Sequence, residues 1–355
     1  MKKAELGVFG VAFMFIGTIL GAGYASGREV WQFFGVFGKT GFIGIGIVTV
    51  MFMAVGLMSG SVARMLNTND LGKIIVPGEN RFLKSFAGNF MAALLFIMIV
   101  TMSAAGGALS YQQFGQSRAL GGAVVVILVI ITVIGEFERV SGTFRFVLPV
   151  LMAIVIFTSA AAILKSGGVM NTGGVFKPSP LAANWPLAAA IFLSYNSIGI
   201  IPIMSTASTH AKSKTHAYYG AALGGLSLGI IAVLQLYTML TDLSLSAGFD
   251  MPMLGFAQSL SPAINFIYVF GLFFAIFSSA TGNFYGFTAR VIKAPYRKLK
   301  IIVSSWIGFA LGLVGFTRIV AYLFPVEGFI GFAIIFMLTV NYIKLTREER
   351  TGHGV

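Results

Sequence analysis

The stretch GTILGAGYASGREVWQFF, residues 17–34, brings together residues that a membrane-spanning helix rarely combines. Its first half is apolar, its middle is rich in glycine, and two charged residues, Arg28 and Glu29, follow the glycines. Glycine weakens a helix, and a charged side chain at the centre of a bilayer costs about 3 kcal/mol or more. The stretch is therefore expected to interrupt its helix and to turn its polar groups toward the protein interior rather than toward lipid.

The rest of the chain has the composition of a membrane protein. Of its 355 residues, 57% are hydrophobic and 10% are charged, whereas soluble domains carry about 25% charged residues. The apolar runs are continuous, which predicts an all-α protein rather than a β-barrel. The absence of cysteine excludes disulfides and thiolate metal sites, and the three histidines are scattered. No polar stretch is long enough for a separate soluble domain, so residues 1–355 are expected to form one transmembrane domain.

Ten apolar segments are long enough to cross a membrane as helices. They are residues 7–34, 41–65, 85–110, 119–135, 143–165, 185–209, 216–240, 263–290, 301–317 and 319–343. With the N-terminus in the cytoplasm, 18 of the 24 Lys and Arg residues fall at the chain ends and in cytoplasmic loops. This bias predicts that both termini are cytoplasmic, in a bacterial cytoplasmic (inner) membrane, and it explains the net charge of +13 without a nucleic-acid partner.

The start of the chain permits a second interpretation. Residues 2–27 have a basic beginning, an apolar core and an AGYAS end, which together resemble a cleavable signal peptide. Cleavage would leave nine spans and disrupt the charge pattern, so the ten-span topology is preferred.

The ten spans divide into two equal halves, residues 7–165 and 185–343. Five spans per half is an odd number, so the second half must enter the membrane from the opposite side. This predicts a 5+5 inverted repeat, in which the substrate lies at the midplane where the first helix of each half is interrupted. The sixth span carries its own interruption, SYNSIGIIP, residues 194–202.

The two interruptions predict unwound segments at 21–27 and 194–199, packed side by side. A small solute would lie between them, its anionic group at backbone amides near Gly27 and any amine at carbonyls of the second break. The residues expected to line it are Gly21, Ala22, Gly23, Tyr24, Gly27, Tyr195, Asn196 and Ser197. The competing interpretation is that the glycines only allow close helix packing, as small-xxx-small motifs do in many membrane helices.

The eighth span contains AIFSSATGNFYG, residues 275–286. Ala275, Ser278 and Ser279 share one helical face by their i, i+3, i+4 spacing. Two hydroxyls and a carbonyl suit Na⁺, a hard cation that prefers oxygen ligands. The alternative is that these hydroxyls bond to carbonyls of their own helix.

Two broken helices in a five-plus-five chain resemble the LeuT-type fold of the amino acid–polyamine–cation superfamily. Residues 17–34 are similar to its YkvI-like branch, which is grouped with amino acid permeases. Gly17, Leu20, Gly21 and Gly23 match the Gly-x-x-hydrophobic-Gly-x-Gly stretch of sodium-coupled members. The resemblance implies that the carbonyls of Gly17 and Leu20 join the eighth-span residues around Na⁺. It also implies that Phe192 forms an aromatic lid over the substrate.

The resemblance is incomplete at three places. Tyr24 and Leu193 replace the Asn and Thr of the family's second sodium site, and the third span lacks the substrate-binding Tyr. The family's outer Arg falls one residue before Arg28. Arg28 and Glu327 are nevertheless expected at similar depth, where they would pair as a gate when the site is closed from outside. The alternative is that Arg28 binds Glu29 or lipid headgroups while Glu327 faces water.

These observations predict a secondary transporter for a small amino-acid-like or carboxylate-bearing solute, driven by Na⁺ and needing no cofactor. Proton-coupled or uncoupled transport is the nearest alternative. A channel would need a polar ring along a pore, and none is evident. An enzyme is not expected, because no catalytic motif is present and the loops are short.

Overall fold

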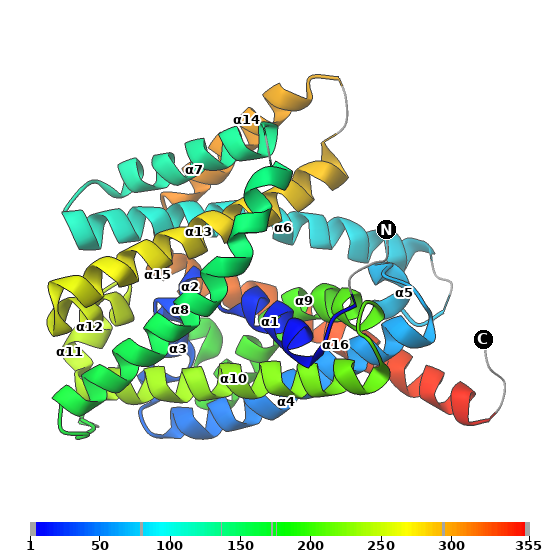
Figure 1. The fold of residues 1–355 in the computed structure, drawn as a ribbon, viewed down its shortest axis with the longest axis horizontal. Helices are drawn as coiled ribbons and strands as arrows, with labels where there is room; N and C mark the ends of the chain where they lie inside the picture. The colour runs from blue at the N-terminus through cyan, green and yellow to red at the C-terminus, as the bar shows by residue number, and fades with distance from the viewer. Residues whose placement is uncertain are drawn as a thin grey trace.

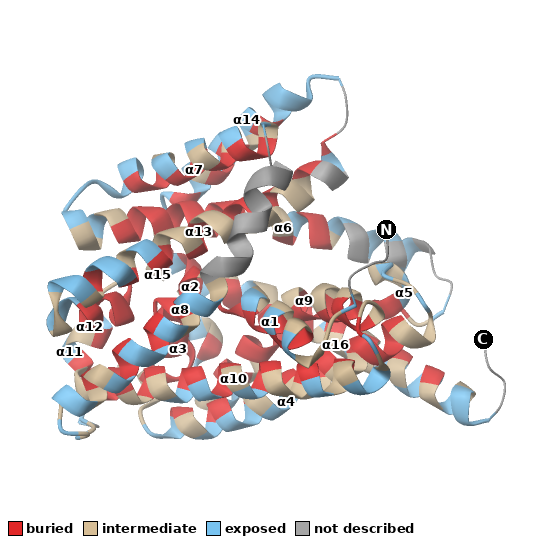
Figure 2. Cartoon of the chain, viewed as in Figure 1, coloured by how far each residue is buried: buried red, intermediate tan, exposed pale blue. Residues whose placement is uncertain are grey.

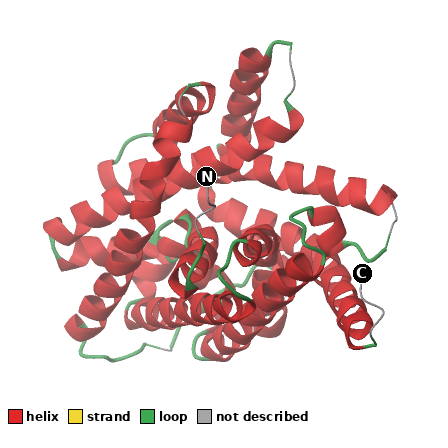
Figure 3. Ribbon diagram, turned by 45° about the vertical axis from the view of Figure 1, so that its right-hand side comes forward, coloured by secondary structure: helices red, strands yellow, loops and turns green. Residues whose placement is uncertain are grey.

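The computed structural model describes residues 5–78, 81–135, 137–171, 173–174, 176–292 and 295–351. Within these ranges the chain is helical and has no strand, which confirms the all-α prediction (Figure 3). The first three helices are α1 (Val8–Ile19), α2 (Ala22–Ala25) and α3 (Arg28–Phe33), followed by the short 3₁₀ helix η1 (Gly35–Phe37). The helices from there to the middle of the chain are α4 (Thr40–Met65), α5 (Leu71–Ile75), α6 (Arg81–Phe114), α7 (Arg118–Ile134) and α8 (Phe137–Lys165).

The second half has the same helical character. Its elements are η2 (Pro180–Ala182), α9 (Trp185–Thr209), α10 (Lys214–Thr241), α11 (Leu243–Gly248), α12 (Pro252–Leu260), α13 (Pro262–Val291), α14 (Arg297–Gly312), α15 (Phe316–Arg318), η3 (Ile319–Leu323) and α16 (Phe324–Arg350). The ninth span ends earlier than predicted, because Gly315 adopts a φ of 101° and turns the chain before Phe316.

Seven helical segments of the described chain are long and apolar enough to cross a membrane, and α1 and α7 are shorter apolar helices. The chain is therefore an integral, multi-pass membrane protein, as expected. Helix α14 is counted neither among these seven segments nor among the shorter apolar helices. The count of ten spans, the 5+5 repeat and the cytoplasmic position of both termini stay predictions.

The helices form two groups with α8 crossing between them (Figure 1). In one group α1, α4, α9 and α10 pack together, with α16 lying on α9 and α4; in the other, α6 packs against α7, α13 and α14. Buried residues line the faces that the helices turn toward one another (Figure 2). Many exposed residues are large and apolar, such as Ile43 on α4 and Phe266 on α13, as expected of a surface that faces lipid.

The first span is interrupted, as predicted. Helix α1 ends at Ile19, the four-residue α2 follows, and α3 begins after Gly27. Gly27 adopts a φ of 76°, a left-handed conformation that glycine reaches without steric cost. Between α1 and α2, Gly21 is extended, with a φ of −82° and a ψ of −171°. The glycines thus change the direction of the backbone at two points within one span.

The sixth span is not interrupted, so the predicted unwinding at 194–199 is wrong. Helix α9 runs unbroken from Trp185 to Thr209. The polar side chains of the motif form hydrogen bonds within their own helix. Asn196 Nδ2 donates to the Phe192 carbonyl at 2.9 Å, and Ser197 Oγ donates to the Leu193 carbonyl at 2.7 Å. Such bonds to the preceding turn let polar residues remain inside a helix. Of the two predicted broken helices, only the first is broken in this structure.

A helical hairpin, α11–α12, joins α10 to α13 and was not foreseen from the sequence. It lies at the opposite end of the molecule from α5 (Figure 1). Asp242 caps α11 by accepting the Leu245 N–H at 2.9 Å; this backbone hydrogen bond lowers the pKa of the Asp242 carboxyl. Pro252 occupies the first turn of α12, a position that suits proline. The Asp and the Pro are the sequence signals that could have revealed both helices.

The hairpin is bound to both groups of helices. The Met253 N–H donates to the Ser26 carbonyl at 2.9 Å, which attaches the hairpin to the first span. On the other side, Gln112 of α6 both donates to and accepts from the Met251 backbone, at 3.0 and 2.9 Å. Asp250 forms an ion pair with Arg118 at the start of α7. The hairpin therefore bridges the first span and α6–α7.

Candidate functional site

The break after α1 frees backbone carbonyls inside the protein. The Gly21 N–H, which would bond to Gly17 in a continuous helix, donates instead to the Ile19 carbonyl at 2.7 Å. Within the described chain no group donates a hydrogen bond to the carbonyl of Leu20. Leu20 is buried, and a buried carbonyl without a partner costs free energy. Among the described residues the carbonyls of Gly17 and Leu20 thus lack the hydrogen bonds of a continuous helix, and their role as sodium ligands stays a prediction.

Helix α13 places its hydroxyls beside this break. A Cβ atom on Gly21 would lie 3.6 Å from Ser279 Oγ. Ser278 Oγ donates to the Ala275 carbonyl of its own helix at 3.2 Å, which is the alternative to a sodium ligand for this hydroxyl. Ser279 Oγ has no hydrogen-bond partner among the described residues. A Cβ on Gly17 would meet Leu148 Cδ2 of α8 at 3.1 Å, which closes the far side of α1.

Glu29 occupies the space beside the second glycine of the break. A Cβ atom on Gly23 would lie 1.9 Å from Glu29 Oε1. The other carboxylate oxygen, Oε2, accepts a hydrogen bond from the Tyr195 hydroxyl on α9. Glu29 and Tyr195 are both buried. From the sequence, Glu29 was considered only as the neighbour of Arg28, and its role at the break was missed.

Phe192 lies in a cluster of aromatic side chains rather than over an open space. Five ring centroids lie 4.9 to 6.1 Å from its own; they belong to Tyr24, Phe33, Phe34, Phe52 and Tyr195. The Tyr24 hydroxyl points away from the break and donates to the Leu228 carbonyl of α10 at 2.6 Å. The structure thus brings Gly23, Tyr24, Phe192 and Tyr195 together, with their own side chains filling the space between them.

Ala22 and Gly27 are buried at the two ends of the break. A Cβ atom on Gly27 would meet Met253 Cγ at 2.7 Å, so the hairpin covers this end. The Arg28 N–H donates to Ser26 Oγ at 3.4 Å. Asn196 and Ser197 turn their polar groups into α9 itself. The predicted amine site at carbonyls of a sixth-span break is therefore absent in this structure.

The predicted gate between Arg28 and Glu327 is not formed. Arg28 Nη2 donates to Gln32 Oε1 at 3.2 Å, and Nη1 donates to the Phe249 carbonyl of the hairpin at 3.5 Å. Within the described ranges neither residue takes part in an ion pair. Successive residues of a helix point about 100° apart, so Arg28 reaches the hairpin while Glu29 faces α9. Glu327 interacts electrostatically with Glu29 rather than with Arg28.

Two further polar side chains at the break were missed. Gln235 Nε2 of α10 donates to the Tyr24 carbonyl at 2.9 Å, and the Tyr268 hydroxyl of α13 donates to the Ala25 carbonyl at 2.6 Å. Both are fully buried. A lone Gln within an apolar span is the signal that could have identified the first, since buried polar residues in membrane helices usually bond across helices.

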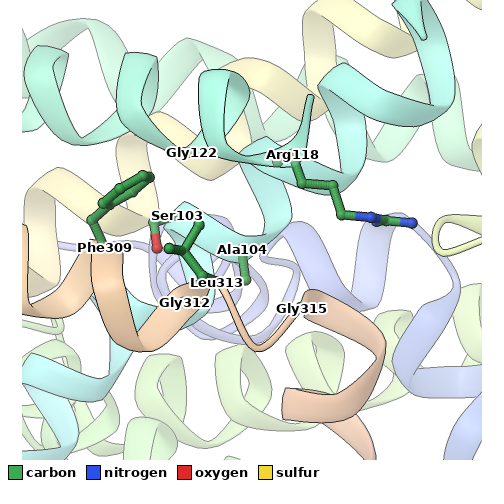
Figure 4. A pocket seen from close by; sticks show the side chains of 9 residues that line it. Ser103, Ala104, Arg118, Gly122, Phe309, Gly312, Leu313 and Gly315 are labelled. Atoms are coloured by element: carbon green, nitrogen blue, oxygen red, sulfur yellow. The ribbon is translucent and has the colours of Figure 1, made fainter. Parts of the chain in front are cut away.

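A separate pocket lies between α6, α7 and α14 (Figure 4), with an empty volume of about 250 Å³. It is lined by Ser103, Ala104, Gly107, Arg118, Gly122, Phe309, Gly312, Leu313 and Gly315. No residue of the break contributes to it, and it holds no carboxylate. The arrangement around the break, rather than this pocket, offers the chemistry that a bound solute or ion would need.

Comparison with known proteins identifies the fold. No family model matches the chain. The chain is 25% identical over 346 residues to the uncharacterized membrane protein YkvI of Bacillus subtilis strain 168, covering 94% of this chain and 96% of YkvI. Its fold matches the inward-facing conformation of Mhp1 with a TM-score of 0.66 and 14% identity, over 98% of this chain and 78% of Mhp1. The chain has the LeuT fold.

A second structure agrees. MhsT in complex with L-phenylalanine matches this chain with a TM-score of 0.61 and 16% identity, over 96% of this chain and 88% of MhsT. The predicted resemblance to LeuT-fold transporters and to the YkvI-like branch is thereby confirmed. The proteins it resembles include a membrane protein and a manganese transporter, in agreement with the prediction that the chain is not an enzyme. In this chain α9 and α13 lie at the break through Tyr195, Tyr268 and Ser279.

Proposed function

We propose that this LeuT-fold chain is a secondary transporter that moves a small, amino-acid-like solute across the membrane by alternating access, coupled to Na⁺. One observation carries the proposal: the broken first span presents free carbonyls next to the unpartnered Ser279 hydroxyl. Oxygen atoms from the two sides of this contact, the first span and α13, suit a monovalent hard cation. A bound ion would hold α1 against α13, and its release would let them separate.

In this proposal the solute binds beside the ion, between the break and α9. Gly21, Gly23, Phe192 and Tyr195 surround this region. The chain's own side chains fill it in this conformation, so solute entry requires that Glu29 or the aromatic cluster moves. The solved structure of MhsT contains L-phenylalanine, which supports an amino-acid-like solute for this chain as well. Proton-coupled or uncoupled transport is the alternative that the experiment below separates.

The sodium site predicts ion-specific stabilisation of the purified chain. Na⁺ that binds only the folded state raises its melting temperature by mass action, worth about 2.7 kcal/mol at 100 times the dissociation constant. We expect a higher melting temperature in NaCl than in KCl at equal ionic strength, and Ser279→Ala should remove most of this difference.

Ser227→Ala is the matched control for this experiment. Ser227 is half-buried on α10 and its hydroxyl bonds to the Leu223 carbonyl within its own helix. This variant should keep the full response to Na⁺. Equal melting temperatures of the unmodified chain in NaCl and KCl would contradict the sodium site and leave proton-coupled or uncoupled transport as the better explanation.

A further inference from the structure

Two acids approach Tyr195, and neither is paired with a cation within the described chain. Glu29 accepts a hydrogen bond from the Tyr195 hydroxyl, and Glu327 lies one turn after Phe324, whose ring centroid is 4.9 Å from that of Tyr195. Only 7% of Glu29 is exposed, and Glu327 of α16 is half-buried. The two are near enough for their charges to interact. Within the described chain neither forms an ion pair, and Glu327 accepts no hydrogen bond. Buried charges in proteins are normally paired, neutralised by a proton or bound to a ligand.

The groups that face Glu29 do not supply the missing positive charge. From α9, the Tyr195 hydroxyl donates to Oε2; from α16, Glu327 adds a second negative charge; from α2, Tyr24 is the other titratable neighbour. Arg28 precedes Glu29 in α3, but its guanidinium bonds to the Phe249 carbonyl and Gln32. No charged group of the described chain balances the two acids.

The position of Glu327 is set by close packing of α16 against α9. Gly328 and Gly331 bring α16 against α9, since Cβ atoms there would lie 2.9 Å from the Ile191 carbonyl oxygen and 2.7 Å from the Ser194 carbonyl oxygen. Ser194 Oγ also donates to the Gly328 carbonyl at 2.6 Å. Helix α16 therefore cannot move Glu327 away from α9 without breaking this contact. Glu327 is thus held beside α9, where Tyr195 also binds Glu29 of α3.

We propose that Glu29, Glu327 and the Tyr195 hydroxyl form the binding site for the positively charged amino group of the transported solute, and that the two acids share a proton when the site is empty. This inference rests on the proposed function and names the chemical class of its substrate. It replaces the amine site expected at sixth-span carbonyls, which a continuous α9 does not offer. When an ammonium group enters, the shared proton leaves to solution, so the charge of the site stays balanced.

The two Glu29 oxygens have different surroundings, which explains how Glu29 can act both in the empty site and in the site with a bound ammonium group. Oε2 is held by the Tyr195 hydroxyl, whereas Oε1 lies against Gly23 at the break itself. Glycine at this position leaves the carboxylate next to the backbone, where a side chain would exclude it. An ammonium group, with its three N–H donors, could then bond to Oε1, to Glu327 and to a carbonyl freed by the break.

The test uses sets of three probes that share a carbon skeleton. One set is leucine, isoamylamine and 4-methylpentanoate; the others are built in the same way on alanine and phenylalanine. Binding to the purified full-length chain is measured by calorimetry, and proton release with a pH indicator in weak buffer. For at least one skeleton we expect the amino acid and the amine to bind with proton release, more tightly at higher pH, and the acid lacking nitrogen to bind at least tenfold more weakly.

Variants assign the effect to the acids. Glu29→Gln and Glu327→Gln should each weaken binding of the best probe about 10- to 100-fold and reduce proton release, because a hydrogen bond to a charged group is lost. Tyr195→Phe keeps both acids and should weaken binding about tenfold, which preserves the test if an acid variant does not fold. Glu348→Gln, at the exposed end of the same α16, is the matched control and should bind normally.

Three outcomes would overturn the inference. Normal amine binding in Glu29→Gln, Glu327→Gln and Tyr195→Phe would place the amino group elsewhere, while the sodium response could still support the transporter. Equal binding of the acids lacking nitrogen would show that the amino group is not recognised. Binding of no probe by the unmodified chain would exclude a small amine, and the melting experiment in NaCl and KCl would then report separately on the proposed function.

Discussion

Gly23→Ala is expected to abolish solute binding and transport. The added methyl group would lie 1.9 Å from Glu29 Oε1 and 2.8 Å from its carboxyl carbon, so the Glu29 side chain must leave the break. Leaving the break separates Glu29 from the Tyr195 hydroxyl and moves it away from Glu327. Binding of the best probe should fall at least 100-fold, measured by calorimetry on the purified variant.

Gly282→Ala on α13 is the control, because nothing lies within 4 Å of a Cβ atom there. Alanine favours a helix over glycine by about 1 kcal/mol, so this variant should be as stable as the unmodified chain or slightly more so, with unchanged binding. If Gly23→Ala binds the probe normally, Glu29 can leave the break without loss, and the site does not depend on it.

Gly27→Ala is expected to be the most destabilising single-methyl change in the first span. The φ of 76° costs an alanine about 1–2 kcal/mol. The methyl group would also lie 2.7 Å from Met253 Cγ and 3.3 Å from Met239 Sδ, so the hairpin must shift. Overpacking of this kind typically costs about 1–3 kcal/mol more. The melting temperature in detergent should fall clearly below that of the unmodified chain.

Two variants separate the causes of that loss. Gly115→Ala has a similar φ of 65° but open space around it, so it measures the backbone cost alone. Adding Met253→Ala to Gly27→Ala removes the clashing side chain and should recover part of the stability. If Gly27→Ala and Gly115→Ala melt at the same temperature, the hairpin does not press on the break.

The first span was predictable because its signal is local. Gly21 and Gly27 sit where the backbone bends, and Arg28 and Glu29 require an interior position whatever surrounds them. The prediction for the sixth span was wrong because the same residue types can form their hydrogen bonds within an unbroken helix. Asn196 and Ser197 each reach a carbonyl one turn earlier, and sequence alone does not show which outcome packing favours.

The tertiary pairing of the site could not be predicted. Arg28 and Glu29 are neighbours in sequence, yet one contacts the hairpin and the other α9. Which of them approaches Glu327 depends on how α3 is rotated about its axis, and that rotation is set at Gly27. The spacing of Ala275, Ser278 and Ser279 was predictable because it depends only on the helix, and Ser279 lies beside Gly21; sodium binding by these residues stays a prediction.

The contacts of the hairpin would make the proposed opening and closing of the protein sensitive to ionic strength. It is held to α6 and α7 by polar bonds, among them the Arg118–Asp250 ion pair, in which 43% of the Arg118 side chain and 18% of the Asp250 side chain are exposed. If α6 and α7 part from the first span as the outer side opens, the hairpin must release one of them. Dissolved salt weakens an exposed ion pair but hardly affects buried apolar contacts. If the chain opens outward by alternating access, as proposed, the salt content of the medium around it would change how often it does so.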